Sequence, residues 1–145
     1  MPVVPAYFDS SVLLKRYVRE QGSDRALILT HRYFIISAAI APIEMRSALR
    51  RVEANGGLST TAFQATLKRI QTDRERWDLV AISTEILQSA ERLTIDVNIR
   101  SLDALHLACA LACQSRLKHR LPFVTADLRQ GDAARNLGLE IISIE

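Results

Sequence analysis

The sequence predicts an α/β domain built on a mainly parallel sheet with helices on both faces. Short apolar segments rich in β-branched and aromatic residues alternate with segments in which apolar residues recur every three or four positions. Such alternation is typical of parallel sheets, because parallel neighbours are joined by crossover helices. With 145 residues the chain is long enough for a hydrophobic core, and we expect a single domain over residues 1–145.

The N-terminal elements follow from this pattern. Residues 3–8 are mostly apolar and predict a buried strand that ends at Asp9. Ser10 or Ser11 is expected to cap the helix that follows, because a serine hydroxyl accepts a hydrogen bond from a free backbone N–H of the first turn. A second helix is expected after Gly22, to about His31.

The next elements form a strand and a helical hairpin. Residues 33–36 are aromatic and β-branched, so they predict a strand, which Ser37 is expected to end. A helix over 42–55 has a proline in its first turn, where the missing N–H has no cost, and it ends at two glycines. Ser59 is expected to cap the following helix, which makes the pair a hairpin.

The remaining elements repeat the alternation. Residues 79–82 predict a third strand, and Ser83 opens an amphipathic helix. The last segments are a strand over 121–125, a helix from about Asp127 to Asn136 that ends at Gly138, and a fifth strand over 140–144.

Residues 100–113 predict a helix that is apolar all round, and such a helix is buried on most sides. Ser101 is its expected N-cap. Asp103 nevertheless lies in its first turn, and a carboxylate entering a core needs a compensating hydrogen bond, cation or metal. The helix dipole contributes only about 0.3–1 kcal/mol at an exposed terminus, so we expect a cation and further acids nearby.

Three other acids lie at similar junctions. Asp9 follows the first strand, Asp127 follows the fourth, and Glu44 lies in the first turns of the helix after the second. Sites in parallel sheets form beyond the carboxyl ends of the strands, so the four acids are expected to share one rim. Taken singly, Asp9 and Asp127 are equally well explained as helix caps, and Glu44 is better explained as a surface residue.

Carboxylates brought together repel, by roughly 3 kcal/mol for a pair about 5 Å apart at an effective dielectric of 20. A cation that binds between them relieves this repulsion. Oxygen ligands without cysteine or an organised histidine set favour Mg²⁺ or Mn²⁺ over zinc. Such ions activate water for phosphodiester hydrolysis, so the acids predict a metal-dependent nuclease.

Four sequence blocks carry a resemblance to a known family. They are Tyr7–Lys15, Ile43–Leu49, Leu102–Ala108, and Val124–Asp127 with Ala133–Leu139. In this order they resemble the signature blocks of PIN domains, most closely those of the VapC toxin type. The resemblance spans essentially the whole chain.

This resemblance implies a three-layer fold with a five-stranded parallel sheet, and a Mg²⁺- or Mn²⁺-dependent endoribonuclease acting on RNA. It implies that Asp9, Glu44, Asp103 and Asp127 form the family's acidic quartet. It further implies a homodimer and a cognate VapB-type antitoxin encoded next to the toxin. The rival interpretation is a catalytically degenerate PIN-like module that only binds a partner protein.

Other polar residues have weaker predictions. Thr125 is equally well explained as a hydroxyl near the metal or as a strand-end residue. His106 is expected to be a satisfied core histidine, bonded to a backbone carbonyl, and Asp132 a surface residue. Lys15 and Arg100 are the better candidates for binding RNA phosphates. Aromatic residues are only 6% of the chain, and no stacking platform is evident.

Some function classes are disfavoured. An aspartyl-phosphate phosphatase needs a second carboxylate at position 11, which is Ser11, and a phospho-receiver needs paired acids where Tyr7 and Phe8 stand. No segment predicts a signal peptide or a membrane span. Cys109 and Cys113 are expected to be core residues without a disulfide, so the cytoplasm is the expected compartment. The net charge of +3 is compatible with a polyanionic partner.

Overall fold

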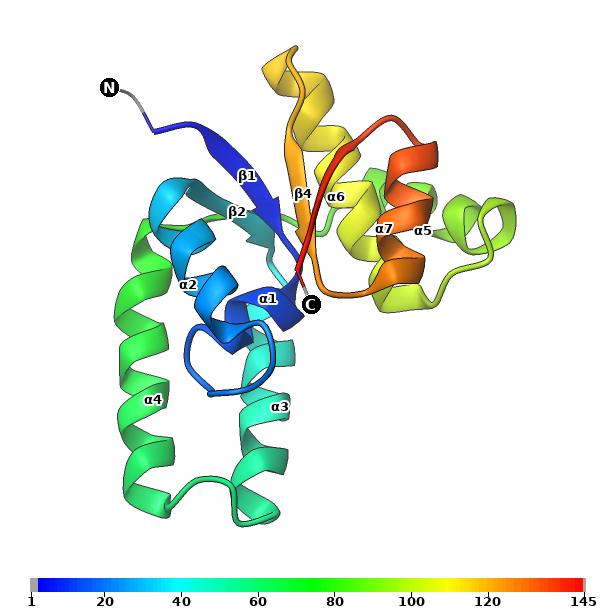
Figure 1. Cartoon of the computed structure of the whole chain (residues 1–145). Coiled ribbons are helices and arrows are strands. Elements are labelled where there is room, and N and C mark those ends of the chain that lie inside the picture. The colour runs from blue at the N-terminus through cyan, green and yellow to red at the C-terminus, as the bar shows by residue number, and fades with distance from the viewer. Residues whose placement is uncertain (1–2, 145) are drawn as a thin grey trace.

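The computed structural model describes residues 3–144 and has a five-stranded, all-parallel sheet between two layers of helices (Figure 1). The strands are β1 (Pro5–Phe8), β2 (Phe34–Ala38), β3 (Asp78–Val80), β4 (Pro122–Thr125) and β5 (Glu140–Ser143). The order across the sheet is β3-β2-β1-β4-β5. The predicted fold class is therefore confirmed.

The strand order reverses between β1 and β4. From β1 the chain adds β2 and β3 on one side, and then β4 and β5 on the other. The register pairs Tyr7 with Phe123 and Phe8 with Val124. In open α/β sheets, ligands bind beyond the carboxyl ends of the strands at such a switch point. Asp9 and Asp127 follow the two strands that meet there.

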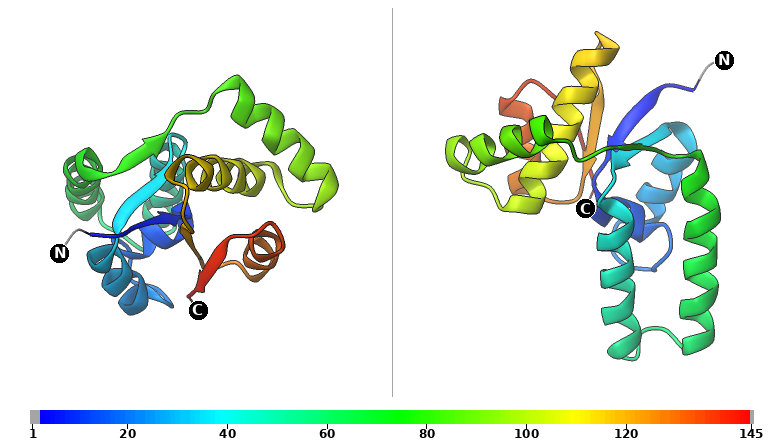
Figure 2. Two further views of the ribbon diagram at one scale, coloured as in Figure 1. Left: turned by 90° about the horizontal axis from the view of Figure 1, so that it is seen from above. Right: turned by 180° about the vertical axis from the view of Figure 1, so that it is seen from behind.

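The helices cover the sheet on both faces. They are α1 (Ser10–Lys15), α2 (Ser23–Arg32), α3 (Ala41–Ala54), α4 (Thr60–Asp73), the 3₁₀ helix η1 (Arg74–Arg76), α5 (Thr84–Asp96), α6 (Ser101–Leu117) and α7 (Leu128–Asn136). Two cores result, one under α5, α6 and α7 and the other under α1 to α4. The hairpin of α3 and α4 extends well beyond the sheet (Figure 2).

Strand β1 supplies both cores, because successive side chains of a strand face opposite sides of the sheet. Ala6 and Phe8 lie in the core on the α1 to α4 side, and Tyr7 lies in the other. Helix α6 is the predicted apolar helix, and it extends to Leu117 before Lys118 adopts a left-handed conformation at φ 59°. Its Leu102 is nearly half exposed, so the helix start is less buried than expected.

Several helix and strand ends differ from the prediction. Asp9, not a serine, caps α1, because its carboxylate accepts from Ser11 N. Arg100, not Ser101, occupies the N-cap position of α6 and forms no side-chain cap bond. Strand β2 continues through Ser37 to Ala38. The Ser37 hydroxyl donates to the backbone oxygen of Phe8, at 2.7 Å, so this serine links two strands instead of ending one.

Other local predictions are confirmed. Ser59 and Ser83 cap α4 and α5. Cys109 and Cys113 are buried free thiols. Within residues 3–144 no helix combines the length and apolarity needed to cross a bilayer. The predicted domain bounds of 1–145 include Met1, Pro2 and Glu145, which lie outside the described residues.

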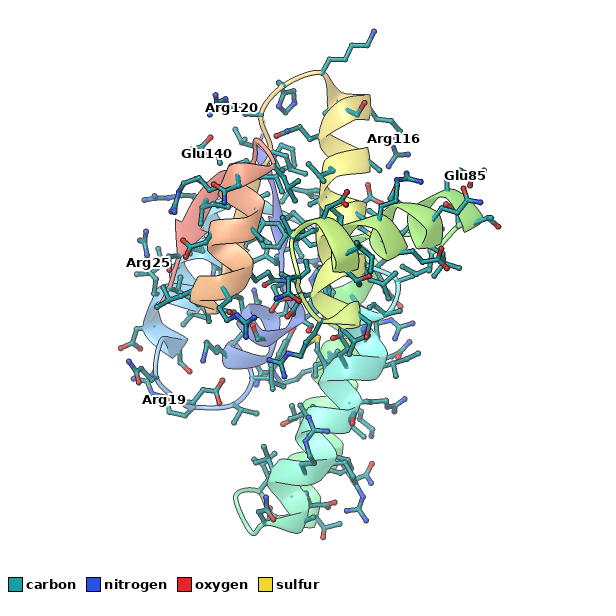
Figure 3. All side chains as sticks on the ribbon, turned by 90° about the vertical axis from the view of Figure 1, so that its right-hand side faces the viewer. Arg19, Arg25, Glu85, Arg116, Arg120 and Glu140 are labelled. Atoms are coloured by element: carbon teal, nitrogen blue, oxygen red, sulfur yellow. The ribbon has the colours of Figure 1, made fainter. Side chains whose placement is uncertain are left out.

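Charged side chains extend outward around the molecule. Figure 3 shows Arg19, Arg25, Glu85, Arg116, Arg120 and Glu140 at its periphery. All six residues are exposed. Their charges are solvated, so they contribute to the field around the protein and little to the fold.

Candidate functional site

A cavity of about 590 Å³ lies beyond the carboxyl ends of β1 and β4. All four predicted acids line it, namely Asp9, Glu44, Asp103 and Asp127. They come from four separate segments: the caps of α1 and α7 and the first turns of α3 and α6. Arg100 and Leu102 lie in the same wall. The sheet thus brings together the acids that the sequence predicted would share one rim.

Asp9 is held by hydrogen bonds on both carboxylate oxygens. Oδ2 accepts from the backbone N–H and the hydroxyl of Ser11, and Oδ1 accepts from Gln130 Nε2 at 3.3 Å. The residue is only 7% exposed. These donors compensate part of the desolvation of a buried carboxylate and fix its orientation toward the cavity.

A hydrogen bond from a buried histidine holds Glu44 in place. His106 Nε2 lies 2.7 Å from Glu44 Oε1, and His106 Nδ1 lies 2.7 Å from the hydroxyl of Tyr7. A carboxylate can only accept, so Nε2 carries a proton and donates to Glu44. His106 Nε2 is also 3.8 Å from Asp9 Oδ1. The predicted backbone-carbonyl partner of His106 was therefore wrong, because Tyr7 and Glu44 already occupy both ring nitrogens.

His106 and Tyr7 both have shifted pKa values. Burial lowers the pKa of His106, but the hydrogen bond to Glu44 and the charges of the nearby acids together raise it above its usual value. Burial, with smaller effects from Cys109 and Asp9, holds the pKa of Tyr7 well above its usual range. The tyrosine therefore stays a neutral hydroxyl, able to donate to or accept from the imidazole.

The pKa of Asp103 is raised by burial and by its acidic neighbours. Burial raises the pKa of its carboxyl, and the charges of Asp9 and Asp127 raise it further. Arg100 and His106 lower it, but they do not offset the other effects. The charged form of Asp103 is therefore less stable in this cavity than in water. A bound cation would stabilise it.

Asp127 combines a structural and a site position. Its Oδ1 accepts from the backbone N–H groups of Arg129, at 2.9 Å, and Gln130, at 3.2 Å, so it caps α7. Its own N–H donates to Thr125 Oγ1 at 3.0 Å. Thr125 is fully buried, and this hydrogen bond to its hydroxyl fixes the strand-to-helix turn. Asp132 is exposed and paired with Arg135, as expected of a surface residue.

Gln130 is a site residue that the sequence prediction missed. It is 1% exposed, accepts from the Thr125 hydroxyl at 2.7 Å and donates to Asp9. Because the Thr125 oxygen already accepts from Asp127 N–H, its single proton goes to Gln130 Oε1, and this leaves Nε2 for Asp9. Helical spacing from the buried Ala133 and Ala134 could have placed this glutamine on the inner face.

The two candidate phosphate-binding residues differ in position. Arg100 lines the acidic cavity and lowers the pKa of Asp103. Lys15 forms an ion pair with Glu20 at 3.0 Å and lines a neighbouring cavity of about 410 Å³, which shares Ala126 with the acidic one. Arg100 is therefore the better placed of the two for a phosphate at the acids.

The acids present hard oxygen donors, which suit Mg²⁺ or Mn²⁺. Within the described part of the chain, no group of three or more His, Cys, Asp and Glu side chains converges closely enough to form a complete protein cage. Mg²⁺ does not need one, because it is commonly held by one or two carboxylates and keeps several waters. The cavity has room for those waters. The donor set therefore fits a hydrated divalent ion.

Comparisons with known proteins agree with the fold. The sequence profile of the PIN domain family matches residues 6–136. No curated protein sequence matches the chain.

Solved structures with this fold come from several bacteria. The structure titled FitAcB from Neisseria gonorrhoeae is 12% identical, with a TM-score of 0.69 over 94% of this chain and 96% of that one. VapBC2 from Rickettsia felis, bound to a promoter DNA fragment, is 11% identical, with a TM-score of 0.67 over 98% and 100%. VapBC-5 from Mycobacterium tuberculosis, of the VapBC family of toxin-antitoxin systems, is 18% identical, with a TM-score of 0.56 over 99% of both chains.

Proposed function

The chain belongs to the PIN domain family, and we propose that it is a Mg²⁺- or Mn²⁺-dependent endoribonuclease, the toxin of a VapBC-type toxin–antitoxin pair. The observation that carries the proposal is the cavity between β1 and β4, where four acids from separate segments meet. The raised pKa of Asp103 supports the same proposal, because burial and then the charges of Asp9 and Asp127 disfavour its carboxylate, and a bound cation would favour it.

The proposed metal ligands are Asp9, Glu44, Asp103 and Asp127, with one or two of these carboxylates bound directly and the others bound through waters of the ion. When bound, a divalent ion lowers the pKa of a coordinated water and neutralises charge on the scissile phosphate. The protein's own residues keep the acids in position: Ser11 and Gln130 orient Asp9, and His106 orients Glu44.

Arg100 is the proposed phosphate ligand. It lies in the cavity wall at the N-terminal end of α6, where the helix dipole also favours an anion. An RNA phosphate drawn to this end of the cavity would lie beside Asp103. The guanidinium offers several N–H donors in a fixed plane, which suits phosphate oxygens.

The proposed antitoxin partner is supported by apolar side chains beside the acids. Ile43, Leu102 and Leu128 are 71%, 49% and 63% exposed, and each is the direct sequence neighbour of an acid. A partner protein that covers this rim would bury them and block the cavity. VapBC-5, one of the similar solved structures, is a member of the VapBC family of toxin–antitoxin systems. A homodimer and a cytoplasmic location are further parts of the proposal.

The test is cleavage of single-stranded RNA by the purified chain with Mg²⁺ or Mn²⁺, and with EDTA. Asp9 and Asp127 cap helices, so alanine there would confound folding with catalysis. Asp103→Asn is the cleaner variant, because Asp103 caps nothing and asparagine keeps its size. The matched control is Asp132→Asn on the surface of α7.

We expect cleavage only with the metal, its loss in Asp103→Asn, and full activity in Asp132→Asn. Cleavage that continues in EDTA, or that survives in Asp103→Asn, would refute the assignment of the acids. Absence of any cleavage, with tight binding to the product of a neighbouring gene, would favour the degenerate partner-binding module.

A further inference from the structure

A second cavity, of about 390 Å³, lies at the opposite end of the sheet from the acids. Its lining includes Val3, just before β1, Phe34, the first residue of β2, and Trp77, just before β3. All strands are parallel, so these residues mark the amino ends of strands whose carboxyl ends carry the acids. Strand β1 has four residues, so the two cavities are separated by on the order of 13 Å.

This second cavity gathers aromatic side chains that are distant in sequence. Tyr33, Phe34 and Trp77 all line it. Four of the other aromatic residues are buried, whereas these three keep part of their surface open. Tyr33 and Trp77 also pack against the core under α1 to α4, so their positions are fixed by packing. This grouping was not evident in the sequence, because the three residues come together only when β2 and β3 pair.

Two arginines and a histidine surround the aromatic side chains. Arg16, His31 and Arg76 line the same cavity, and Asp73 is the one acid there among the described residues. Asp73 Oδ2 accepts from the Tyr17 hydroxyl at 2.6 Å and lies 4.0 Å from Arg16 Nε. Among residues 3–144, Arg16 Nε is the only buried side-chain nitrogen or oxygen without a hydrogen-bond partner. The Arg16 guanidinium therefore adds positive charge to the cavity wall, and Asp73 offsets part of it.

We propose that this second cavity, through Trp77, Phe34 and Arg76, binds an unpaired nucleotide of single-stranded RNA at a distance from the bond that is cut. Aromatic faces stack on any base, and arginines beside them bind the adjoining phosphates. The volume lies in the range of cavities that hold small ligands. This inference rests on the proposed ribonuclease function only for the identity of the nucleic acid.

Trp77 is the only tryptophan in the chain, so its fluorescence reports directly on this cavity. The experiment titrates the wild-type protein in EDTA with an unstructured RNA decanucleotide and follows emission, with a lone phosphate ion as a second probe. We expect saturable quenching by the RNA and little change with phosphate alone. An absence of quenching at RNA concentrations that saturate binding by anisotropy would overturn the proposal.

Two variants and a matched control separate stacking from general attraction. Phe34→Leu keeps an apolar side chain but removes a ring, and it should weaken RNA binding about tenfold, within the range for loss of a stacked base. Arg76→Ser should weaken it as well. Arg74→Ser changes the same charge on the same 3₁₀ helix, but Arg74 lines a different cavity. Equal weakening by the two arginine variants would overturn the proposal.

The two proposals fail in different ways. Cleavage of RNA without quenching of Trp77 would refute the nucleotide site in the second cavity and would support the ribonuclease proposal. Quenching without cleavage would do the reverse. Quenching by a partner protein, with no response to RNA, would show that this cavity is a protein-docking site and would also overturn the nucleotide proposal. Circular dichroism of each variant checks that it folds.

Discussion

Replacement of Asp103 by asparagine should stabilise the metal-free protein while it abolishes the proposed activity. Burial and the charges of Asp9 and Asp127 raise the pKa of Asp103. When a carboxyl group has a higher pKa in the folded state than in the unfolded state, the folded protein loses stability as the pH rises from the unfolded-state pKa through the folded-state pKa. Asparagine has no charge to lose, so the advantage of the variant should grow over that interval and then level off.

The size of the effect follows from Coulomb's law. Two unit charges about 6 Å apart repel by roughly 0.7 kcal/mol in water and by roughly 3 kcal/mol at an effective dielectric of 20. Asp103 is half-buried and partly offset by Arg100, so we take the lower part of this range, about 1 kcal/mol. For a chain of this size that is an increase in Tm of about 3 °C.

The assay is thermal unfolding at pH 8 in EDTA and then in Mg²⁺. Mg²⁺ at about ten times its Kd should raise the stability of the wild type by about 1.4 kcal/mol and should raise that of Asp103→Asn less. Asp132→Asn should behave like the wild type in both conditions, because Asp132 lies on the exposed side of α7. A lower Tm for Asp103→Asn in EDTA, or equal stabilisation of both by Mg²⁺, would refute the reasoning.

Three further outcomes are expected. Tyr7→Phe removes the hydroxyl that contacts His106 Nδ1 in the core, so it should lower the free energy of unfolding by about 1–3 kcal/mol in urea titrations. An unchanged midpoint would contradict a stabilising hydrogen bond between Tyr7 and His106. Burial raises the pKa of Cys109 to about 12, so a disulfide reagent at pH 8 should modify it only as fast as the protein unfolds, and rapid labelling of the native protein would count against this. Gln130→Leu removes the amide donor to Asp9 and should weaken Mg²⁺ binding about tenfold or more in calorimetry, whereas an unaltered Kd would rule out a positioning role.

The sequence was sufficient for the elements and for the positions of the acids. Apolar patterning located all five strands, because each contains a run of apolar residues, buried in β1, β2 and β4 and half-buried in the edge strands β3 and β5. The same pattern put Asp9 and Asp127 at strand ends, and parallel strands end on one edge. The apolar pattern could not predict that β4 inserts beside β1, because strand order depends on contacts between distant segments.

The partners of the acids were not predictable for the same reason. His106 contacts Glu44 and Tyr7 only after α6 docks on β1, and Gln130 reaches Asp9 only after β4 pairs with β1. The predicted N-caps of α1 and α6 were also wrong. Two serines after β1 suggested a serine cap, but an aspartate one position earlier is an equally good acceptor, and it is the residue at which the chain leaves the sheet.

The pairing of Phe8 with Val124 has a consequence for synthesis of the protein. Asp127 emerges from the ribosome 118 residues after Asp9 (127 − 9), and the cavity between them exists only once β4 has inserted beside β1. A partly made chain therefore carries some of the acids but no assembled site. If the chain does cut RNA, the message that encodes it is exposed only to chains in which β4 has been made and has inserted beside β1. The fold itself therefore sets the moment at which they become active.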